Sequence, residues 1–261
     1  MVRCGMGCCP GPHVLPISIA ILTLLSLITA YTISFLKGHI KRQFPYISET
    51  GASSPESCIF GELWNTIAVL LGIFYYFISK QVSAYFSEVS TRGTRRLLRM
   101  NNVALAFGFL DSFGISVVAN FQITNLGYTH YVGAALAYLG LCVNAGINTA
   151  LSYKMHYFTS RTVCRTRLVA TFGMTLLSSI TCTTGVLFWT LSYSNYKLHN
   201  ASTLSQWLMV LMMLVYVLTY VHEFKRMTIT PLKMNIRLNG HVYDMNLGSD
   251  DESRDSEGSL I

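Results

Sequence analysis

The chain has 261 residues, of which 51% are hydrophobic and 12% are charged, whereas soluble domains carry about a quarter charged residues. Apolar residues gathered in long blocks need a lipid solvent, so this composition excludes an ordinary soluble domain. A net charge of +7 is also typical of nucleic-acid binding, but the basic residues lie between apolar blocks, which favours a role in membrane orientation and no nucleic-acid partner.

The chain begins with a short segment, residues 1–13, that we expect to lie in the cytosol. It carries three cysteines, Cys4, Cys8 and Cys9. Cysteines beside a membrane span are typical of S-palmitoylation, with unmodified thiols as the alternative. A zinc site is less favoured because His13 is the one imidazole nearby. We expect lipid attachment there, and neither a metal nor another cofactor on the chain.

Six apolar stretches follow, each long enough for a helix to cross a hydrocarbon core of about 30 Å. Continuous apolar runs without two-residue alternation favour helices over a barrel. The predicted fold class is therefore all-α, a polytopic transmembrane bundle of six helices over residues 14–224, with an ordered lumenal loop between helices 1 and 2. The expected spans are residues 14–36, 60–79, 102–121, 131–152, 168–192 and 204–222.

Lys and Arg residues give the bundle a predicted orientation, because they accumulate on the cytosolic side of membrane proteins. Four of the 19 lie on one side of the predicted spans: Lys37, Lys41, Arg42 and Lys197. All the others, Arg167 among them, lie in the alternate connections and the two ends. We therefore predict that both termini are cytosolic.

The first lumenal loop is rich in prolines, glycines and hydroxyl residues. We expect an ordered cap made of turns rather than of helix. The residues of interest there are Pro45, Tyr46, Ile47, Ser48, Glu49, Thr50, Gly51, Pro55, Glu56, Phe60 and Gly61.

The predicted spans contain several polar residues, Glu62 and Asn65 among them, of which we single out Asp111, Asn144 and Asn148. A carboxylate at mid-membrane is unfavourable unless it is paired or neutralised, so Asp111 is either structural or an ion or proton site. Asn144 and Asn148 are four residues apart and share one helix face, where they can form hydrogen bonds between helices. We favour the structural interpretation over transport. Small residues in the same span, Gly133 and Gly140 among them, predict close helix approach.

The remaining features lie toward the C-terminal end. Asn200 begins the sequon Asn200-Ala201-Ser202, which falls in a predicted lumenal loop, where N-glycosylation takes place. Residues 225–261 form a polar cytosolic tail, and its clustered charge predicts disorder from about residue 240. Walker loops and the H-E-x-x-H and G-x-S-x-G patterns do not occur in the sequence, so we expect no catalytic residues and no enzyme.

The loop motif resembles that of the DRAM family, the damage-regulated autophagy modulators, within the Frag/DRAM/Sfk superfamily of six-span membrane proteins. The similarity covers about residues 14–240 and departs from the family at Gln206, which precedes Trp207 where the family has a Glu-Trp pair. Further residues that carry the resemblance are Asn120, Phe121, Gln122, His130 and Gly133.

The resemblance implies a non-enzymatic multi-pass protein of lysosomal or other endomembranes that modulates autophagy, with a link to stress-induced apoptosis. Its implied partners are membrane lipids and unidentified protein components of the autophagy or lysosomal machinery. The plasma membrane and the Golgi are alternative locations. Two other functions stay open: a plasma-membrane regulator of phosphoinositide metabolism or lipid asymmetry, as in the Sfk branch, and a transporter or a remodelling factor for lipids and glycosylphosphatidylinositol anchors, as in the Frag branch.

Overall fold

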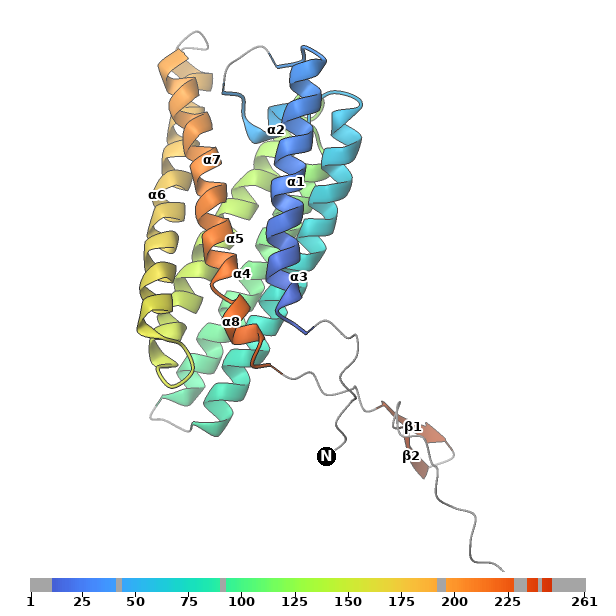
Figure 1. Cartoon of the computed structure of the whole chain (residues 1–261), viewed down its shortest axis with the longest axis vertical. Helices are drawn as coiled ribbons and strands as arrows, with labels where there is room; N and C mark the ends of the chain where they lie inside the picture. The colour runs from blue at the N-terminus through green and yellow to red at the C-terminus, as the bar shows by residue number, and fades with distance from the viewer. Residues whose placement is uncertain are drawn as a thin grey trace, which may run out of the picture. The chain divides into compact units, whose positions relative to one another are not determined.

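The computed structural model describes residues 11–40, 44–89, 93–191 and 196–227, together with two strands. The chain divides into two units, residues 1–227 and residues 228–261. The first unit is a bundle of helices, shown in Figure 1. Its helices are α1 (Val14–Leu36), α2 (Ile47–Thr50), α3 (Glu56–Glu88), α4 (Thr94–Asn120), α5 (Gly127–Lys154), α6 (Arg161–Leu191), α7 (Tyr196–Leu218) and α8 (Val221–Phe224).

Six helical segments of the described chain are long and apolar enough to cross a membrane, which confirms the predicted polytopic helical bundle. The first has the bounds that the sequence predicted, Val14–Leu36. The others begin before their predicted spans, and α3 also continues past its predicted end. Apolar runs mark only the part of a helix that lies in lipid, whereas the polar turns at its ends continue the same hydrogen-bonded ladder.

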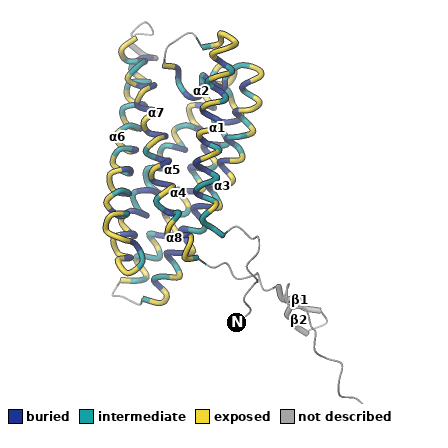
Figure 2. The backbone as a smooth tube through the Cα atoms, viewed as in Figure 1, coloured by how far each residue is buried: buried dark blue, intermediate teal, exposed yellow. Residues whose placement is uncertain are grey.

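Large apolar side chains cover the outside of the bundle, which is typical of a protein surrounded by lipid rather than water. Ile28 in α1, Val69 in α3 and Phe172 in α6 are each more than three-fifths exposed. Figure 2 shows this as exposed positions along the outer sides of the helices, while buried positions face the interior.

Several hydroxyl side chains within the helices bond to the backbone of their own helix. Thr23 donates to the Ile19 carbonyl at 2.8 Å, and Ser152 donates to the Asn148 carbonyl at 2.8 Å. A hydroxyl that faces lipid has no water to bind, so the carbonyl one turn earlier satisfies it. Thr and Ser can therefore occur within these spans without unpaired donors.

The bundle has two ends, which we name after their short helices. The α2 end holds α2 and the α4–α5 connection, and the α8 end holds α8, the start of α1, and the α3–α4 and α5–α6 connections (Figure 1). The closest helix pairs are α4 with α5, α6 with α7, and α3 with α4, whereas α7 packs more sparsely against α1 and α2. Which end faces the cytosol stays a prediction.

The close packing of α4 on α5 depends on glycines, as the small residues of the predicted fourth span indicated. A Cβ atom on Gly140 would lie 2.5 Å from the Asp111 backbone nitrogen and 2.6 Å from the Phe107 carbonyl oxygen. On Gly133 it would lie 2.6 Å from the Val117 side chain. The two backbones therefore approach more closely than any larger residue allows.

The second unit contains a β-hairpin that the sequence did not predict. Strand β1 (Met234–Leu238) pairs antiparallel with β2 (His241–Met245), and Ile236 is opposite Tyr243. Strand β2 occupies the first residues of the tail that we expected to be disordered. The remainder of that tail, residues 246–261, lies outside the described residues.

Candidate functional site

The loop motif forms a cap at the α2 end of the bundle. Where we expected turns alone, the chain makes the single helical turn α2, with Tyr46 as its N-cap. The Glu49 carboxylate accepts a hydrogen bond from the Tyr46 backbone nitrogen at 3.0 Å, and Thr50 Oγ1 donates to the Ile47 carbonyl at 2.6 Å. These local bonds satisfy both ends of a helix too short to be stable alone.

Side chains of α7 hold the cap against the bundle. Gln206 Oε1 accepts a hydrogen bond from the Ile47 backbone nitrogen at 2.9 Å, and Trp207 Nε1 donates to the Pro45 carbonyl at 2.9 Å. The Tyr46 ring also meets the His199 ring edge-on, with 5.1 Å between centroids. The cap is therefore attached to the last long helix, although it follows the first in sequence.

Glycines of the motif allow the cap and α3 to pack closely. A side chain at Gly51 would overlap the Phe60 ring, and a Cβ atom at Gly61 would lie 3.2 Å from the Ala119 carbonyl oxygen. Gly51 therefore needs glycine because the Phe60 ring occupies the space that a side chain would fill, and Gly61 leaves only a tight fit against α4.

Glu56, at the start of α3, is completely buried. Its Oε1 lies 2.5 Å from His39 Nδ1, which follows α1. A buried carboxylate needs such a partner, and this pair fastens the end of α1 to the start of α3. Glu49 caps α2 in the same way, so both cap acids have structural partners.

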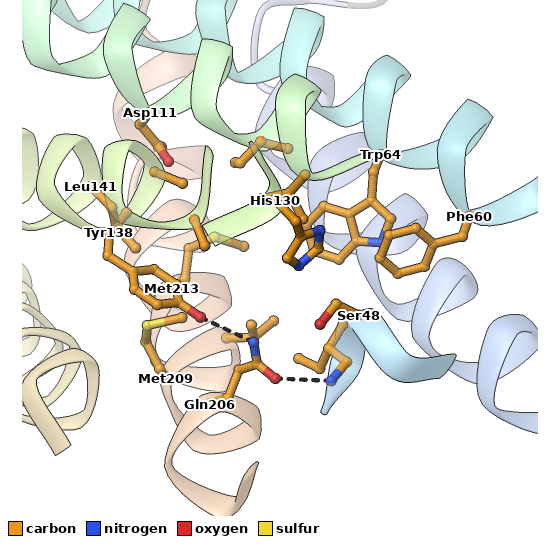
Figure 3. Close-up of a pocket in the computed structure, with 16 residues that line it drawn as sticks. Ser48, Phe60, Trp64, Asp111, His130, Tyr138, Leu141, Gln206, Met209 and Met213 are labelled. Carbon is orange, nitrogen blue, oxygen red and sulfur yellow. Dashed lines mark hydrogen bonds between the residues drawn. The ribbon is translucent and has the colours of Figure 1, made fainter. Parts of the chain in front are cut away.

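A cavity of about 90 Å³ lies beneath the cap (Figure 3). Its roof is formed by Ile47 and Ser48 of α2. Its walls come from α3, α4, α5 and α7 and are mostly apolar; they include Phe60, Trp64, Ile115, Leu141, Met209 and Met213. A concave apolar space with a few convergent polar groups is the usual form of a small-molecule site. We refer to it below as the cap pocket.

Polar groups sit at opposite ends of the cap pocket. Near the cap, Gln206 Nε2 donates to Tyr138 Oη at 3.0 Å, so this amide links α2 to α5 (Figure 3). His130 Nδ1 lies 2.7 Å from the Phe121 carbonyl oxygen. A carbonyl only accepts, so Nδ1 carries the proton and the neutral ring leaves Nε2 as an acceptor. At the far end lies Asp111, whose Oδ2 accepts a bond from Tyr75 Oη at 2.5 Å.

The amides predicted to join helices do so in part. Asn144 Nδ2 donates to the Ala104 carbonyl of α4 at 2.7 Å, which supports its predicted structural role. Asn148 instead donates to Asn144 Oδ1 at 3.2 Å, within α5. Asn148 therefore supports the contact only through Asn144.

Two of the further residues that carry the resemblance, Asn120 and Gln122, form contacts between α3 and α4 and within the α4–α5 turn. Asn120 and Asn65 exchange amide hydrogen bonds of 2.9 and 3.1 Å between α4 and α3. After α4, the Gln122 side chain accepts a bond from Asn125 Nδ2 at 3.0 Å. These contacts fix the turn from which His130 enters the cap pocket.

The α8 end contains a buried polar cluster that the sequence did not reveal. Arg167 Nη2 lies 3.1 Å from Glu223 Oε1, and its guanidinium carbon lies 3.5 Å from the centroid of the Tyr220 ring. Glu223 also accepts hydrogen bonds from Thr159 and Gln81. The prediction that Arg167 lies in a basic connection is therefore wrong, because this residue is buried within α6. The sequence signal for this cluster is Glu223, a single acid at the end of the last apolar run.

Two other predicted sites have different outcomes. Asn200 lies in the second turn of α7, not in a loop as predicted, because that helix begins at Tyr196. Cys4, Cys8 and Cys9 lie outside the described residues. Within the described part of the chain, His, Cys, Asp and Glu form no group of three that could hold a metal ion.

The chain is similar to known proteins over most of its length. Residues 12–227 match the family profile described as Frag1/DRAM/Sfk1/Cwh43P N-terminal domain. DNA damage-regulated autophagy modulator protein 2 of Homo sapiens is 31% identical over 250 residues, which cover 90% of this chain and 91% of that protein. DNA damage-regulated autophagy modulator protein 1 of Homo sapiens is 30% identical over 227 residues, which cover 82% of this chain and 90% of that protein.

A further match covers a smaller part of the chain. Modulator of macroautophagy TMEM150B-A of Xenopus laevis is 33% identical over 141 residues, which cover 53% of this chain and 57% of that protein. No solved structure matches the chain.

Proposed function

Since the chain belongs to the Frag1/DRAM/Sfk1/Cwh43P family, we propose that it is a non-enzymatic multi-pass protein of lysosomal or other endomembranes that modulates autophagy. The observation that carries the proposal is the match along nine-tenths of the chain to a protein named as an autophagy modulator. A link to stress-induced apoptosis belongs to the same proposal.

Geometry favours a binding role for this site over catalysis. Glu49 accepts a hydrogen bond that caps α2, and Glu56 pairs with His39 at the start of α3. The two carboxylates therefore have structural roles and do not form a pair of catalytic acids. The cap pocket is mostly apolar, which suits the binding of a lipid or another membrane-soluble molecule. Its partners are accordingly membrane lipids and protein components of the autophagy machinery.

The charge distribution supports an orientation in which the α8 end faces the cytosol. Arg95, Arg96 and Arg99 are exposed in the first turns of α4, at that end. Basic residues accumulate on the cytosolic side, and both termini then lie there as well. Protease protection on intact vesicles tests this, and a terminus protected from added protease contradicts it.

The autophagy role is tested by deleting the protein in starved cells and measuring the lipidated autophagosome marker with and without lysosomal inhibition. We expect a changed flux that the wild-type chain restores. A rescue variant with Gln206→Leu, which loosens the cap, should restore flux less well than Thr175→Leu, a polar-to-apolar change at an exposed position of α6. Unchanged flux in the deletion removes the proposal.

A second candidate function is favoured by the same exposed arginines. Each basic residue near an anionic leaflet contributes about 1 kcal/mol to membrane attraction, which suits a plasma-membrane regulator of phosphoinositide metabolism. Imaging of the endogenously tagged protein separates the two candidates. Coincidence with lysosomal markers supports the first, and coincidence with surface markers supports the second.

A further inference from the structure

We propose that the cap pocket binds an amphiphilic amine, a ligand with one protonated nitrogen on an apolar body, whose ammonium group pairs with Asp111. The inference rests on the residues of the pocket and does not depend on the role in autophagy.

Asp111 is a buried acid without a balancing cation. It is 1% exposed, and Tyr75 Oη donates to its Oδ2 at 2.5 Å. A tyrosine supplies a proton donor but no positive charge. Among the described residues that line the pocket there is no Lys or Arg, and Arg167 is already paired with Glu223. A negative charge at this depth is unfavourable without a partner, and an ammonium ion supplies one.

The depth of Asp111 restricts what can reach it. It lies nine residues before the end of α4 at Asn120, which is about 13 Å along the helix. A ligand must carry its charge over this length between Trp64, Ile115 and Met213, so its body has to be apolar. Methionine side chains adapt to irregular shapes, and two of them face this space.

Two further groups in the pocket can bind an uncharged polar atom of the ligand. Trp64 Nε1 is buried without a hydrogen-bond partner among the described residues. His130 offers Nε2 as an acceptor, since its Nδ1 is bonded to the Phe121 carbonyl. A hydroxyl group near the apolar body would satisfy either of them. The lining thus offers one free donor, one acceptor and a single carboxylate with no cation beside it, which selects against phosphate and carboxylate ligands.

The test uses the purified full chain in lipid nanodiscs and two photoreactive, alkyne-tagged probes of the same chain length, one a long-chain amine and the other the corresponding alcohol. Labelled peptides are identified by mass spectrometry. We expect the amine to label the α4, α5 and α7 segments of the pocket about tenfold more than the alcohol, the ratio for about 1.4 kcal/mol. An excess of unlabelled amine should abolish this labelling.

Three variants locate the interaction. Asp111→Asn keeps the shape and removes the charge, so amine labelling should fall to the level of the alcohol. Ala134→Phe fills the pocket and leaves Asp111 intact, so labelling by both probes should fall. Glu62→Gln makes the same acid-to-amide change at an exposed position of α3 and should label like the wild type. Thermal melts check that each variant is folded. If Asp111→Asn does not fold, labelling of Ala134→Phe and competition by unlabelled amine test whether the probe binds in the cap pocket.

Equal labelling of the wild type by amine and alcohol overturns the proposal and indicates that a proton on Asp111 removes its charge. Wild-type labelling of Asp111→Asn or of Ala134→Phe by the amine also overturns it. Because binding is measured on the purified protein, a failure here leaves the autophagy proposal standing, and unchanged autophagic flux leaves this one standing.

Discussion

Arg167 Nη2 lies 3.1 Å from Glu223 Oε1, and this pair joins the start of α6 to α8 inside the bundle. Both side chains are buried, at 1% and 2% exposure. Removing one partner of a buried pair leaves an uncompensated charge and typically costs 3–5 kcal/mol, whereas apolar replacement of both is often tolerated. The pair therefore makes a prediction with two parts.

We expect Glu223→Ala to reduce the free energy of unfolding by about 3–5 kcal/mol, which a strongly lowered melting temperature in detergent would show. The double variant Arg167→Met with Glu223→Leu should be more stable than the single variant, because no charge is left unpaired. Glu88→Ala, an exposed acid at the end of α3, serves as the control. A double variant less stable than Glu223→Ala would contradict this explanation.

The α4–α5 contact predicts opposite effects for two glycines of the same helix. Gly140→Ala places a methyl group against the backbone of α4 and should destabilise the protein by about 1–3 kcal/mol. Gly146 has nothing within 4 Å of its would-be Cβ atom, so Gly146→Ala should be neutral or stabilising by up to about 1 kcal/mol. Chemical or thermal denaturation of both variants measures the difference, and equal effects would disprove the close approach.

Loss of the Gln206 amide should loosen the cap without unfolding the bundle. Gln206→Leu removes the acceptor of the Ile47 N–H and the donor to Tyr138, two bonds that contribute about 0.5–1.5 kcal/mol each. Hydrogen exchange at residues 46–51 should become faster, while the α4–α5 core stays protected. Thr175→Leu, at an exposed position of α6, is the control. Slow exchange at the cap in Gln206→Leu would show that this amide does not hold the cap.

The contact between His39 and Glu56 makes a prediction about the junction of α1 and α3. Glu56 Oε2 has no hydrogen-bond partner among the described residues, so Oε1 and His39 supply its main compensation. His39→Ala should destabilise by about 1–3 kcal/mol, and adding Glu56→Gln should recover part of the loss. His156→Ala, at an exposed position of the α8 end, should leave the melting temperature unchanged.

The spans could be predicted because their signal is local. Val14–Leu36 is one unbroken apolar run, and its predicted bounds are those of α1. The last turns of α3 and the first turns of α4 were missed. Residues 80–88 mix polar with apolar side chains and residues 94–99 carry three arginines, and a sequence window for lipid does not see helix that continues outside it.

The cap pocket could be predicted only in part. The loop motif identified its roof, and Asp111 stood out as a polar residue in an apolar run. Gln206 and Tyr138 carry no local signal, because their importance comes from partners in α2 and α7 that lie far away in sequence. The same holds for Arg167, which has the local appearance of an orienting surface charge until Glu223 is placed beside it.

The bond between the Ile47 nitrogen and Gln206 spans 159 residues, and this separation has a consequence for biosynthesis. A ribosome that has released the first loop still has to make most of the protein before the acceptor exists. During that interval the Ile47 nitrogen of α2 has no acceptor from α7, and a polypeptide that stops before α7 lacks this bond altogether. The hydrogen bond that holds the cap to α7 can therefore form only late in synthesis, after the chain has been made as far as Gln206.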